Sequence, residues 1–507
     1  MNNYTIADVL RKTRTSQRVN KDRVAIHFRD RAITYEELDE RSDRLAAGLL
    51  SAGFRKGDRA AVMMHNRPEW IEIFFALAKL GGVLVPVNHL LREREVQHIL
   101  SDSGAAWVLT EERFWPMYDG LRTPQDERSY VVMDVVAEGA LTYEDVVASG
   151  SRDIPIDVDA NDLFLLQYTS GTTGLPKGAM HTHSTVLWNS FYQLPEFGVT
   201  VDDVYLILPA LGWIAGFHDF ALATLWSGGQ LVLHPTGNFD PEDFANTVER
   251  HKVTTVLLVP TVLRRVLGYA DLEQHDLSSL RLVLSGGEPV PVKDIHTMHH
   301  RLPTCHLQQA YGMTEFPTMM LWLSAEDAAT KAGSVGKACR AAEVRIVNES
   351  GDDTEVDEVG EIICRSPACM VGYYKDPEAT AATLAGGWLH TGDLARVDAD
   401  GYVYITGRAK DMILTGGLNV YPAEIEQLIE ARPEVQEAAV IAVPHPEWGE
   451  IGKAIVVLKP GQELEESTLL ASLKKDLASF KVPRIVEFTE TPLPRTLSGK
   501  VRKFLLS

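Results

Sequence analysis

The segment Tyr168–Gly178 has the residue types of a phosphate-binding loop. It reads Tyr-Thr-Ser-Gly-Thr-Thr-Gly-Leu-Pro-Lys-Gly and follows the apolar, strand-like stretch Leu163–Gln167. Glycines let successive backbone N–H groups converge on one anion, hydroxyl side chains add donors, and Lys177 adds a mobile positive charge. It is not the Walker pattern, because Lys177 precedes Gly178 and no Gly-Lys-Ser/Thr occurs. We therefore expect a polyphosphate-binding loop; the weaker alternative is a flexible linker of small polar residues.

Further motifs follow this loop along the chain. They read Ser285-Gly-Gly-Glu-Pro289, Tyr311-Gly-Met-Thr-Glu315, Trp388-Leu-His-Thr-Gly-Asp393 and Pro494-Arg-Thr-Leu-Ser-Gly-Lys500. Together with the loop they resemble the signature motifs of the adenylate-forming superfamily, which contains acyl- and aryl-CoA synthetases, peptide-synthetase adenylation domains and luciferases. The resemblance covers nearly the whole chain. It implies an enzyme that uses ATP to form an acyl-adenylate and releases pyrophosphate.

The resemblance assigns most of the nucleotide contacts. The expected ATP- or AMP-binding residues are Thr169, Ser170, Gly171, Thr172, Thr173, Gly174, Lys177, Gly287, Glu288, Pro289, Ala310, Tyr311, Gly312, Met313, Asp393 and Arg408. The ring of Tyr311 can stack on adenine, and Gly312 allows close approach of the backbone. Asp393 would accept hydrogen bonds from both ribose hydroxyls, because one carboxylate offers two acceptor oxygens. Arg408 would support the same ribose.

Three residues are expected to be catalytic by the same resemblance. Thr314 meets the phosphate, and Glu315 holds Mg²⁺, since a hard cation already bound to phosphate oxygens needs few protein carboxylates. Lys500 matches the adenylation lysine. Attack of a carboxylate on the α-phosphate brings two anions together, and a lysine about 4 Å from a unit charge contributes on the order of 4 kcal/mol at an effective dielectric near 20. That corresponds to roughly a thousandfold in rate.

A second group of residues is expected to serve the transfer step. Lys410 lies two residues after Arg408, where the family has a hinge about which a small C-terminal domain turns. Gly416, Gly417 and Leu418 would then line the tunnel for the pantetheine arm of CoA, where side chains would narrow the passage. A strand-to-helix turn at the same place is compatible with that role.

The expected acyl pocket comprises Trp213, Gly216, Phe217 and Gly286. Gly212-Trp213 is similar to the corresponding segment of acetyl-CoA synthetases, although core packing is an equally good interpretation of Trp213. Those enzymes carry a tryptophan just before the Thr-Glu motif, whereas this chain has Gln309-Ala310-Tyr311-Gly312. We therefore expect a medium-chain, alicyclic or aromatic acid rather than acetate.

Three alternatives stay open. A stand-alone adenylation enzyme would load a carrier-protein pantetheine thiol, but the Phe-Asp segment that binds an amino-acid ammonium is missing and Asp219 lies beyond Gly216. A luciferase-like oxygenase would share every motif. A catalytically inactive nucleotide-binding regulator is disfavoured, because both Glu315 and Lys500 are present.

The pattern of apolar segments predicts an α/β fold in more than one domain. Pro68–Leu80 has helical spacing between two strand-like runs, and short strands with Gly, Asp and Asn turns begin near Gly333. A helix at Pro422–Glu430 and a strand at Ala438–Pro444 begin a final module. We expect residues 1–409 to form a large N-terminal domain of layered α/β sheets with a β-rich subdomain, and residues 410–507 a small mobile α+β domain.

Composition limits the partners. The formal net charge of -21 disfavours a nucleic-acid binder and requires local cations and dipoles to hold anionic substrates. The four cysteines form no CxxC pair and predict no disulfide framework. His181, His183, His299 and His300 lack the further ligands of a metal site. With no signal peptide or apolar span in the sequence, we expect a cytoplasmic enzyme. Its partners are the carboxylic acid, ATP, Mg²⁺ and CoA; a homodimer stays open.

Overall fold

The computed structural model of the protein describes residues 4–15, 22–151, 154, 156–169, 176–287, 289–415, 418–495 and 500–506. The chain forms two compact units. The larger comprises the described residues up to Glu343 together with Arg365–Leu384, and the smaller comprises Val344–Cys364 and the described residues from Ala385 onward. The helices in the described part of the chain are too short or too polar to cross a membrane.

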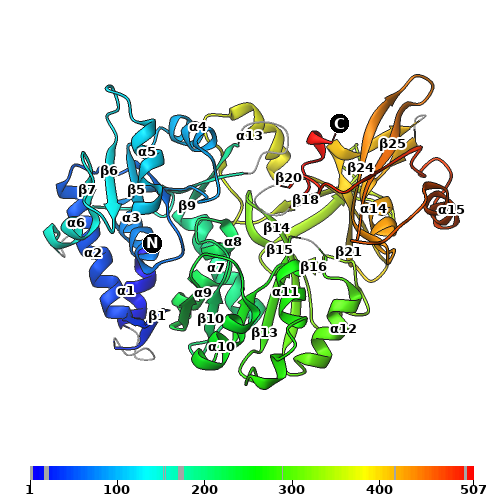
Figure 1. The fold of residues 1–507 in the computed structure, drawn as a ribbon. Coiled ribbons are helices and arrows are strands. Elements are labelled where there is room, and N and C mark those ends of the chain that lie inside the picture. The colour runs from blue at the N-terminus through cyan, green and yellow to red at the C-terminus, as the bar shows by residue number, and fades with distance from the viewer. Residues whose placement is uncertain are drawn as a thin grey trace. The chain divides into compact units, whose positions relative to one another are not determined.

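An eight-stranded sheet forms one half of the larger unit (Figure 1). Its spatial order is β19 (Gly372–Tyr373), β9 (Gly178–Thr182), β8 (Leu163–Tyr168), β4 (Val83–Pro86), β3 (Arg59–Met63), β5 (Trp107–Glu111), β6 (Ser129–Met133) and β7 (Leu141–Thr142). The strands from β8 to β7 run parallel, whereas β9 and β19 are antiparallel to their neighbours. The accompanying helices are α2 (Tyr35–Ser51), α3 (Pro68–Leu80), α4 (Glu93–Ser103), α5 (Trp115–Leu121) and α6 (Tyr143–Ser149).

Local sequence fixes the ends of these helices. The Thr34 side chain accepts a hydrogen bond from the backbone N–H of Glu37, and the Glu37 side chain accepts one from the backbone N–H of Thr34, so a capping box starts α2. Helix α3 has the predicted bounds: Pro68 occupies its first turn, and Gly81 ends it in the left-handed conformation at φ 62°.

A nine-stranded sheet forms the other half of the larger unit. Its order is β16 (Lys337–Ala338), β15 (Phe316–Leu323), β14 (His306–Met313), β13 (Leu282–Gly286), β12 (Thr255–Leu257), β10 (Val204–Ile207), β11 (Gln230–Leu233), β1 (Val24–Phe28) and β2 (Arg31–Thr34). The remaining helices of this unit are α1 (Ala7–Thr15), α7 (His183–Phe197), α8 (Ile214–Phe217), α9 (Ala221–Ser227), α10 (Pro241–His251), α11 (Pro260–Leu267), α12 (Val292–Arg301) and α13 (Pro377–Thr383).

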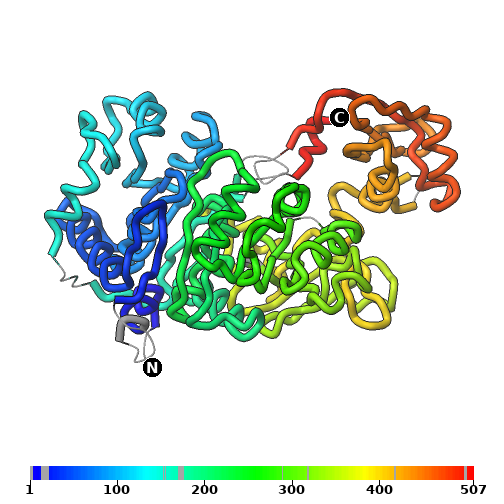
Figure 2. Tube along the Cα trace, turned by 60° about the horizontal axis from the view of Figure 1, so that its bottom comes forward, coloured from blue at the N-terminus to red at the C-terminus, as the bar shows by residue number. Residues whose placement is uncertain are grey.

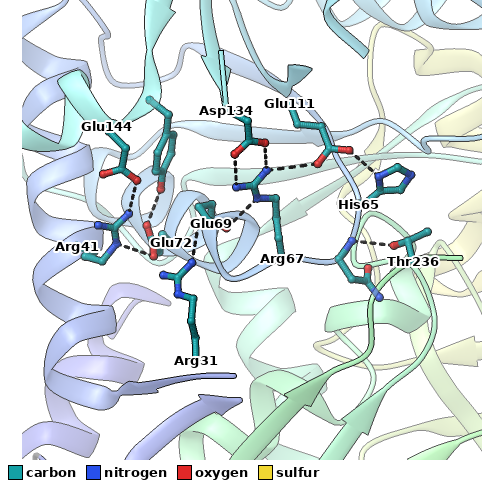
Figure 3. A network of polar contacts seen from close by, with 12 residues as sticks. Arg31, Arg41, His65, Arg67, Glu69, Glu72, Glu111, Asp134, Glu144 and Thr236 are labelled. Atoms are coloured by element: carbon teal, nitrogen blue, oxygen red, sulfur yellow. Dashed lines mark hydrogen bonds and ion pairs between the residues drawn. The ribbon is translucent and has the colours of Figure 1, made fainter. Parts of the chain in front are cut away.

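Polar contacts join the two sheets where several strands end (Figure 3). Arg67, which follows β3, pairs with Glu69 at 2.8 Å and also with Asp134 after β6. Asn66 donates its backbone N–H to Thr236 Oγ1 at 2.8 Å, and Thr236 follows β11 of the other sheet. The side chain of Asn66 also donates to Pro209 O and accepts from Leu211 N. Asn66 therefore holds the segment that the sequence assigned to the acyl pocket.

The smaller unit contains two sheets, and Figure 2 traces the chain as a tube coloured by residue number. One has the order β17 (Glu343–Val347), β18 (Gly360–Arg365), β20 (Leu389–Val397) and β21 (Val403–Arg408). The other contains β22 (Ile413–Thr415), β23 (Leu418–Val420), β24 (Val435–His445), β25 (Gly449–Leu458) and β26 (Ile485–Thr489). Buried side chains of α14 (Pro422–Glu430) and α15 (Glu466–Asp476) share an apolar core with this second sheet.

The expected fold class is confirmed: layered α/β sheets, a β-rich part and an α+β C-terminal part. The β-rich sheet belongs to the smaller compact unit together with the C-terminal residues. The predicted domain boundary between residues 409 and 410 stays a prediction.

Candidate active site

Thr314 and Glu315 form the turn of a β-hairpin in the larger unit. Strands β14 and β15 pair in antiparallel fashion, with Met313 opposite Phe316, so the two intervening residues make the turn. The Glu315 side chain is buried at this turn and is only 8% exposed. The Tyr373 hydroxyl donates to Glu315 Oε1 at 2.6 Å. Burial and the adjacent Glu315 carboxylate raise the pKa of Tyr373 well above its usual range, so the phenol remains a donor.

The Ser285–Pro289 motif lies beside the Tyr311 motif. Strands β13 and β14 are parallel, with Gly286 opposite Ala310, so both motifs lie at the carboxyl ends of neighbouring strands. A Cβ on Gly286 would lie 2.9 Å from Ala310 O, and Gly287 has a φ of 87°. Gln309 Oε1 accepts from Val290 N at 2.7 Å and so holds the end of this loop. Pro289 is exposed, and Glu288 lies outside the described residues.

The phosphate-loop motif joins β8 to β9. Ser170, Gly171, Thr172, Thr173, Gly174 and Leu175 lie outside the described residues. At the base of the loop, Thr169 N donates to Lys177 O at 2.9 Å. Lys177 Nζ lies 3.0 Å from Asp376 Oδ2 and 5.4 Å from the centre of the Tyr373 ring. The loop therefore begins and ends at a hydrogen-bonded strand pair.

Strand β9 connects this loop to the Thr314–Glu315 turn. Nε2 of the His181 ring lies 2.9 Å from the carbonyl oxygen of Thr314. Strand β19 pairs with β9, with Tyr373 opposite Ala179, and Tyr373 bonds Glu315. The backbone N–H of Met370 also donates to Glu315 O at 2.8 Å. The fold thus brings together the base of the phosphate loop and the predicted metal-binding carboxylate, which are far apart in sequence.

The donor set at this turn fits a magnesium ion that is held mainly by phosphate oxygens. Within the described ranges, no three His, Cys, Asp or Glu side chains gather as a metal-binding group. One buried carboxylate with further lone pairs, at Glu315, suits a cation that keeps waters and phosphate oxygens as its other ligands.

Asp393 and Arg408 are neighbours in the smaller unit. They lie opposite each other on β20 and β21, and Arg408 Nε is 2.9 Å from Asp393 Oδ1. Asp393 is 6% exposed. The arginine orients this buried carboxylate, whose oxygens are hydrogen-bond acceptors of the kind that a diol needs. The structure therefore brings the two predicted ribose residues together.

The other predicted residues of the smaller unit are exposed or outside the described chain. Lys410 and Lys500 are both exposed, and Leu418 is exposed on β23. Partial burial and the neighbouring Arg408 guanidinium lower the pKa of Lys410. Gly416 and Gly417 lie outside the described residues, as do residues 496–499 before Lys500.

The predicted acyl residues adjoin helix α8. Trp213 is partly buried and precedes the helix. Its backbone N–H donates a hydrogen bond to Ala210 O. A Cβ on Gly216 would lie only 2.0 Å from Ala210 O, so the turn needs glycine. The Phe217 ring is fully buried and packs on Phe74 at 4.6 Å between ring centres. Its side chain therefore contributes to the core of the larger unit.

Sequence reasoning missed several residues of this region. Asn66 holds the acyl segment, Tyr373 bonds Glu315, and Gln167 bonds Gly212 O through Nε2 at 3.4 Å. His181 was considered only as a metal ligand, whereas its ring supports Thr314. Gln167 directly precedes the phosphate-loop motif, and this position in the sequence could have identified it as a site residue. No local sequence pattern distinguishes Asn66 or Tyr373.

These features define an ATP-binding, adenylate-forming enzyme. The family model described as AMP-binding enzyme matches residues 13–374, and the model described as AMP-binding enzyme C-terminal domain matches residues 424–500. The chain belongs to the AMP-binding enzyme family. This confirms the resemblance to the adenylate-forming superfamily that the motifs indicated.

Similar proteins match the chain over almost its full length. A feruloyl-CoA synthase from Amycolatopsis sp is 40% identical over 491 residues, which cover 96% of each chain. An indoleacetate–CoA ligase from Aromatoleum aromaticum is 34% identical and covers 95% of this chain and 94% of its own. The crystal structure of the anthranilate CoA ligase AuaEII in complex with anthranoyl-AMP has a TM-score of 0.88 and 29% identity, and covers 99% of this chain and 96% of its own.

Proposed function

We propose that the protein is an AMP-forming acid–thiol ligase that joins a bulky carboxylic acid to CoA. ATP and the acid give an acyl-adenylate and pyrophosphate, and the CoA thiol then displaces AMP. The observation that carries the first step is the joining of the phosphate-loop strand β9 to the Thr314–Glu315 turn through His181 and Tyr373. The names of the relatives, which are CoA synthases and ligases, favour CoA over a carrier-protein thiol as the acceptor.

Each residue of the site has a chemical task in adenylation. Lys177 and the loop bind the polyphosphate, and Thr314 donates to the phosphate that is attacked. Glu315 holds Mg²⁺, which when bound neutralises phosphate charge. Asp393 binds the ribose diol and is oriented by Arg408. Lys500 stabilises the charge that develops as two anions meet, an effect of roughly a thousandfold in rate.

The thioester step needs a different set of residues. The small domain turns about Lys410, so that the segment of Gly416, Gly417 and Leu418 lines the path of the pantetheine arm. A hinge of this kind changes the backbone angles of few residues while the units on either side stay folded. The pivot, the cytoplasmic location and a homodimer are likewise proposals.

The acid is aromatic, alicyclic or medium-chain. The relatives named above act, by their names, on feruloyl and indoleacetate groups. In this chain Ala310 and Gly312 flank Tyr311 where acetate-specific relatives carry a tryptophan. Small residues there leave volume for a ring, and a missing methylene in an apolar pocket costs about 1–3 kcal/mol of discrimination.

Pyrophosphate release measured with a panel of acids tests the proposal. The panel contains acetate, hexanoate, cyclohexanecarboxylate, phenylacetate, ferulate and indoleacetate, with CoA or a pantetheinylated carrier protein as the acceptor. We expect release with at least one of the larger acids, and thioester formation with CoA. Absence of release with every acid would contradict an activating enzyme. A highest kcat/KM for acetate would contradict the pocket assignment, and transfer to the carrier protein alone would identify the other acceptor.

A further inference from the structure

Two buried polar side chains lie together on one face of the β8–β9 hairpin. Gln167 is opposite Ala179, and Leu165 is opposite His181. Side chains alternate between the faces of a sheet, and directly opposed residues share a face. Gln167 and His181 are therefore diagonal neighbours on the same face. Their exposures are 7% and 0%.

The hydrogen bond of His181 fixes which ring nitrogen carries the proton. Thr314 O is a carbonyl oxygen and can only accept, so Nε2, at 2.9 Å, is the donor. Burial lowers the pKa of His181 to about 4, which leaves the ring neutral near pH 7. Nδ1 is therefore a bare acceptor. It is buried, and no described residue donates a hydrogen bond to it.

Gln167 presents an acceptor by the same reasoning. Its amide group lies 3.4 Å from Gly212 O, and a carbonyl can receive a hydrogen bond only from the Nε2 side. The other atom of the amide is then Oε1. It is also buried and accepts no hydrogen bond from any residue in the described part of the chain.

Each of the two side chains also bonds a segment of the proposed site. His181 contacts Thr314, which meets the phosphate, and Gln167 contacts Gly212, which precedes Trp213 of the acyl segment. His218, which follows α8, interacts electrostatically with His181, and its Nε2 is another buried atom that lacks a partner among the described residues. Leaving a buried acceptor unsatisfied costs about 1–3 kcal/mol. A donor on a bound molecule would remove that cost.

We propose that the acyl site is built for an acid that carries its own hydrogen-bond donor, a hydroxyl or ring N–H, which Gln167 Oε1 and His181 Nδ1 accept. This inference rests on the proposed function and names its substrate class. A site that pairs with a substrate hydroxyl rejects the analogue that lacks it, because its buried polar groups are then left unpaired. The preferred acids are therefore hydroxylated arylalkanoates or arylacrylates, or acids with a ring N–H.

Matched acids in which a methyl group replaces the donor hydrogen test this inference. The pairs are 2-, 3- and 4-hydroxycinnamate with their methyl ethers, and indole-3-acetate with 1-methylindole-3-acetate. Pyrophosphate release gives kcat/KM for each. The wild-type enzyme should prefer the donor-bearing acid of at least one pair by roughly tenfold or more, which is about 1.4 kcal/mol. This arm needs no variant and stands even if a variant fails to fold.

The variant Gln167→Met adds a test of the residue. It keeps the length of the side chain and removes the acceptor. We expect the ratio of kcat/KM for the donor-bearing acid to kcat/KM for its methylated partner to fall by roughly tenfold. Gln230→Met is the matched control, because Gln230 lies on β11 and bonds His27. This variant should keep the wild-type preference for the donor-bearing acid.

The outcomes separate the two proposals. If acids are activated but no pair shows a preference, or if Gln167→Met lowers both members of the preferred pair equally, the donor-reading site is wrong and the ligase remains. If no acid releases pyrophosphate, the proposed function fails, and the substrate class fails with it.

Discussion

Glu315 and Lys500, both predicted to act in adenylation, have opposite surroundings. Glu315 is buried at a hairpin turn and bonded by Tyr373, and its own carbonyl accepts from Met370. Lys500 is exposed, and the four residues before it lie outside the described chain. Its segment is closed by a bridge between Arg495 and Val501 in the smaller unit. One group is fixed in place by its fold, and the other is carried on the surface of a separate unit.

The predicted roles require the two charges at different times. A metal-binding carboxylate is most effective when it is held in position before the reaction, because no reorganisation then accompanies charge development. A lysine that serves only the first step must be able to withdraw for the second. A side chain buried among fixed partners would lose those contacts each time it left the reaction site. An exposed lysine loses only solvent-screened interactions.

Removal of the lysine should have the largest effect. Lys500→Ala should lower acyl-adenylate formation by roughly a thousandfold, because the charge needed when two anions meet is lost. Thioester formation from supplied acyl-AMP should change little. Single-turnover assays of both half-reactions measure this, with the exposed Lys475→Ala on α15 as control. Equal losses in the two half-reactions would make Lys500 a general structural residue.

Fixing the predicted pivot should separate the half-reactions in the opposite sense. Lys410→Pro restrains φ near -65° and also constrains the preceding residue. We expect acyl-AMP formation to survive within roughly tenfold, about 1.4 kcal/mol, and CoA-dependent turnover to fall by about a hundredfold or more. Lys410→Ala, which leaves the backbone free, should retain both steps. A folded proline variant that keeps both steps, or loses them equally, would show that the pivot lies elsewhere.

Weakening the fixed carboxylate should have a moderate effect. Glu315→Gln keeps the shape but removes a hard anionic ligand, so adenylation should fall by roughly tenfold and require more Mg²⁺. Tyr373→Phe removes only the 2.6 Å hydrogen bond to Glu315 and leaves the carboxylate in place, so adenylation should fall only severalfold. Magnesium titrations of the first half-reaction measure both. An unchanged titration for Glu315→Gln would contradict the metal role.

The smallest effect concerns the stability of the larger unit. Asp219 is 6% exposed, and its Oδ1 has no hydrogen-bond partner among the described residues. Burial raises the pKa of Asp219 well above its usual value of 3.8. The folded state therefore binds a proton that the unfolded state releases above about pH 4, so this group lowers stability as pH rises.

Asp219→Asn removes that proton linkage and keeps the shape of the side chain. Its melting temperature should exceed that of the wild type by about 2 °C at pH 7, the size of shift that roughly 1 kcal/mol gives in a large domain. The difference should shrink as the pH falls to 4, because the unfolded wild type then also begins to bind the proton. Thermal unfolding from pH 4 to 8 measures it; a constant difference over this range would exclude the titration of Asp219 as its cause.

The bounds of several elements were readable because their signals are local. Helix α3 begins at Pro68 and ends before Gly81, and α14 begins at Pro422. Proline at the first turn and glycine just past the end set backbone angles without help from distant residues. The loop motif is equally local, since glycines and hydroxyl residues next to a strand predict a phosphate loop at short range.

The supports of the site were not readable in this way. Tyr373 meets Glu315 only because β19 pairs with β9. His181 meets Thr314 from a strand of a different sheet. Neither residue carries a local pattern, because a tyrosine and a histidine are ordinary in strands, and the pairing of distant strands depends on burial and register across the whole fold.

The sequence by itself determined the chemistry that this protein can attempt. Its residue types and their order carry the resemblance that predicts a phosphate loop, a metal-binding carboxylate, a ribose-binding carboxylate and a catalytic lysine. The tertiary structure decided which groups are fixed and which remain unsatisfied. The tautomer of His181, the acceptor of Gln167 and the burial of Glu315 follow from partners that only the folded chain brings within hydrogen-bond distance.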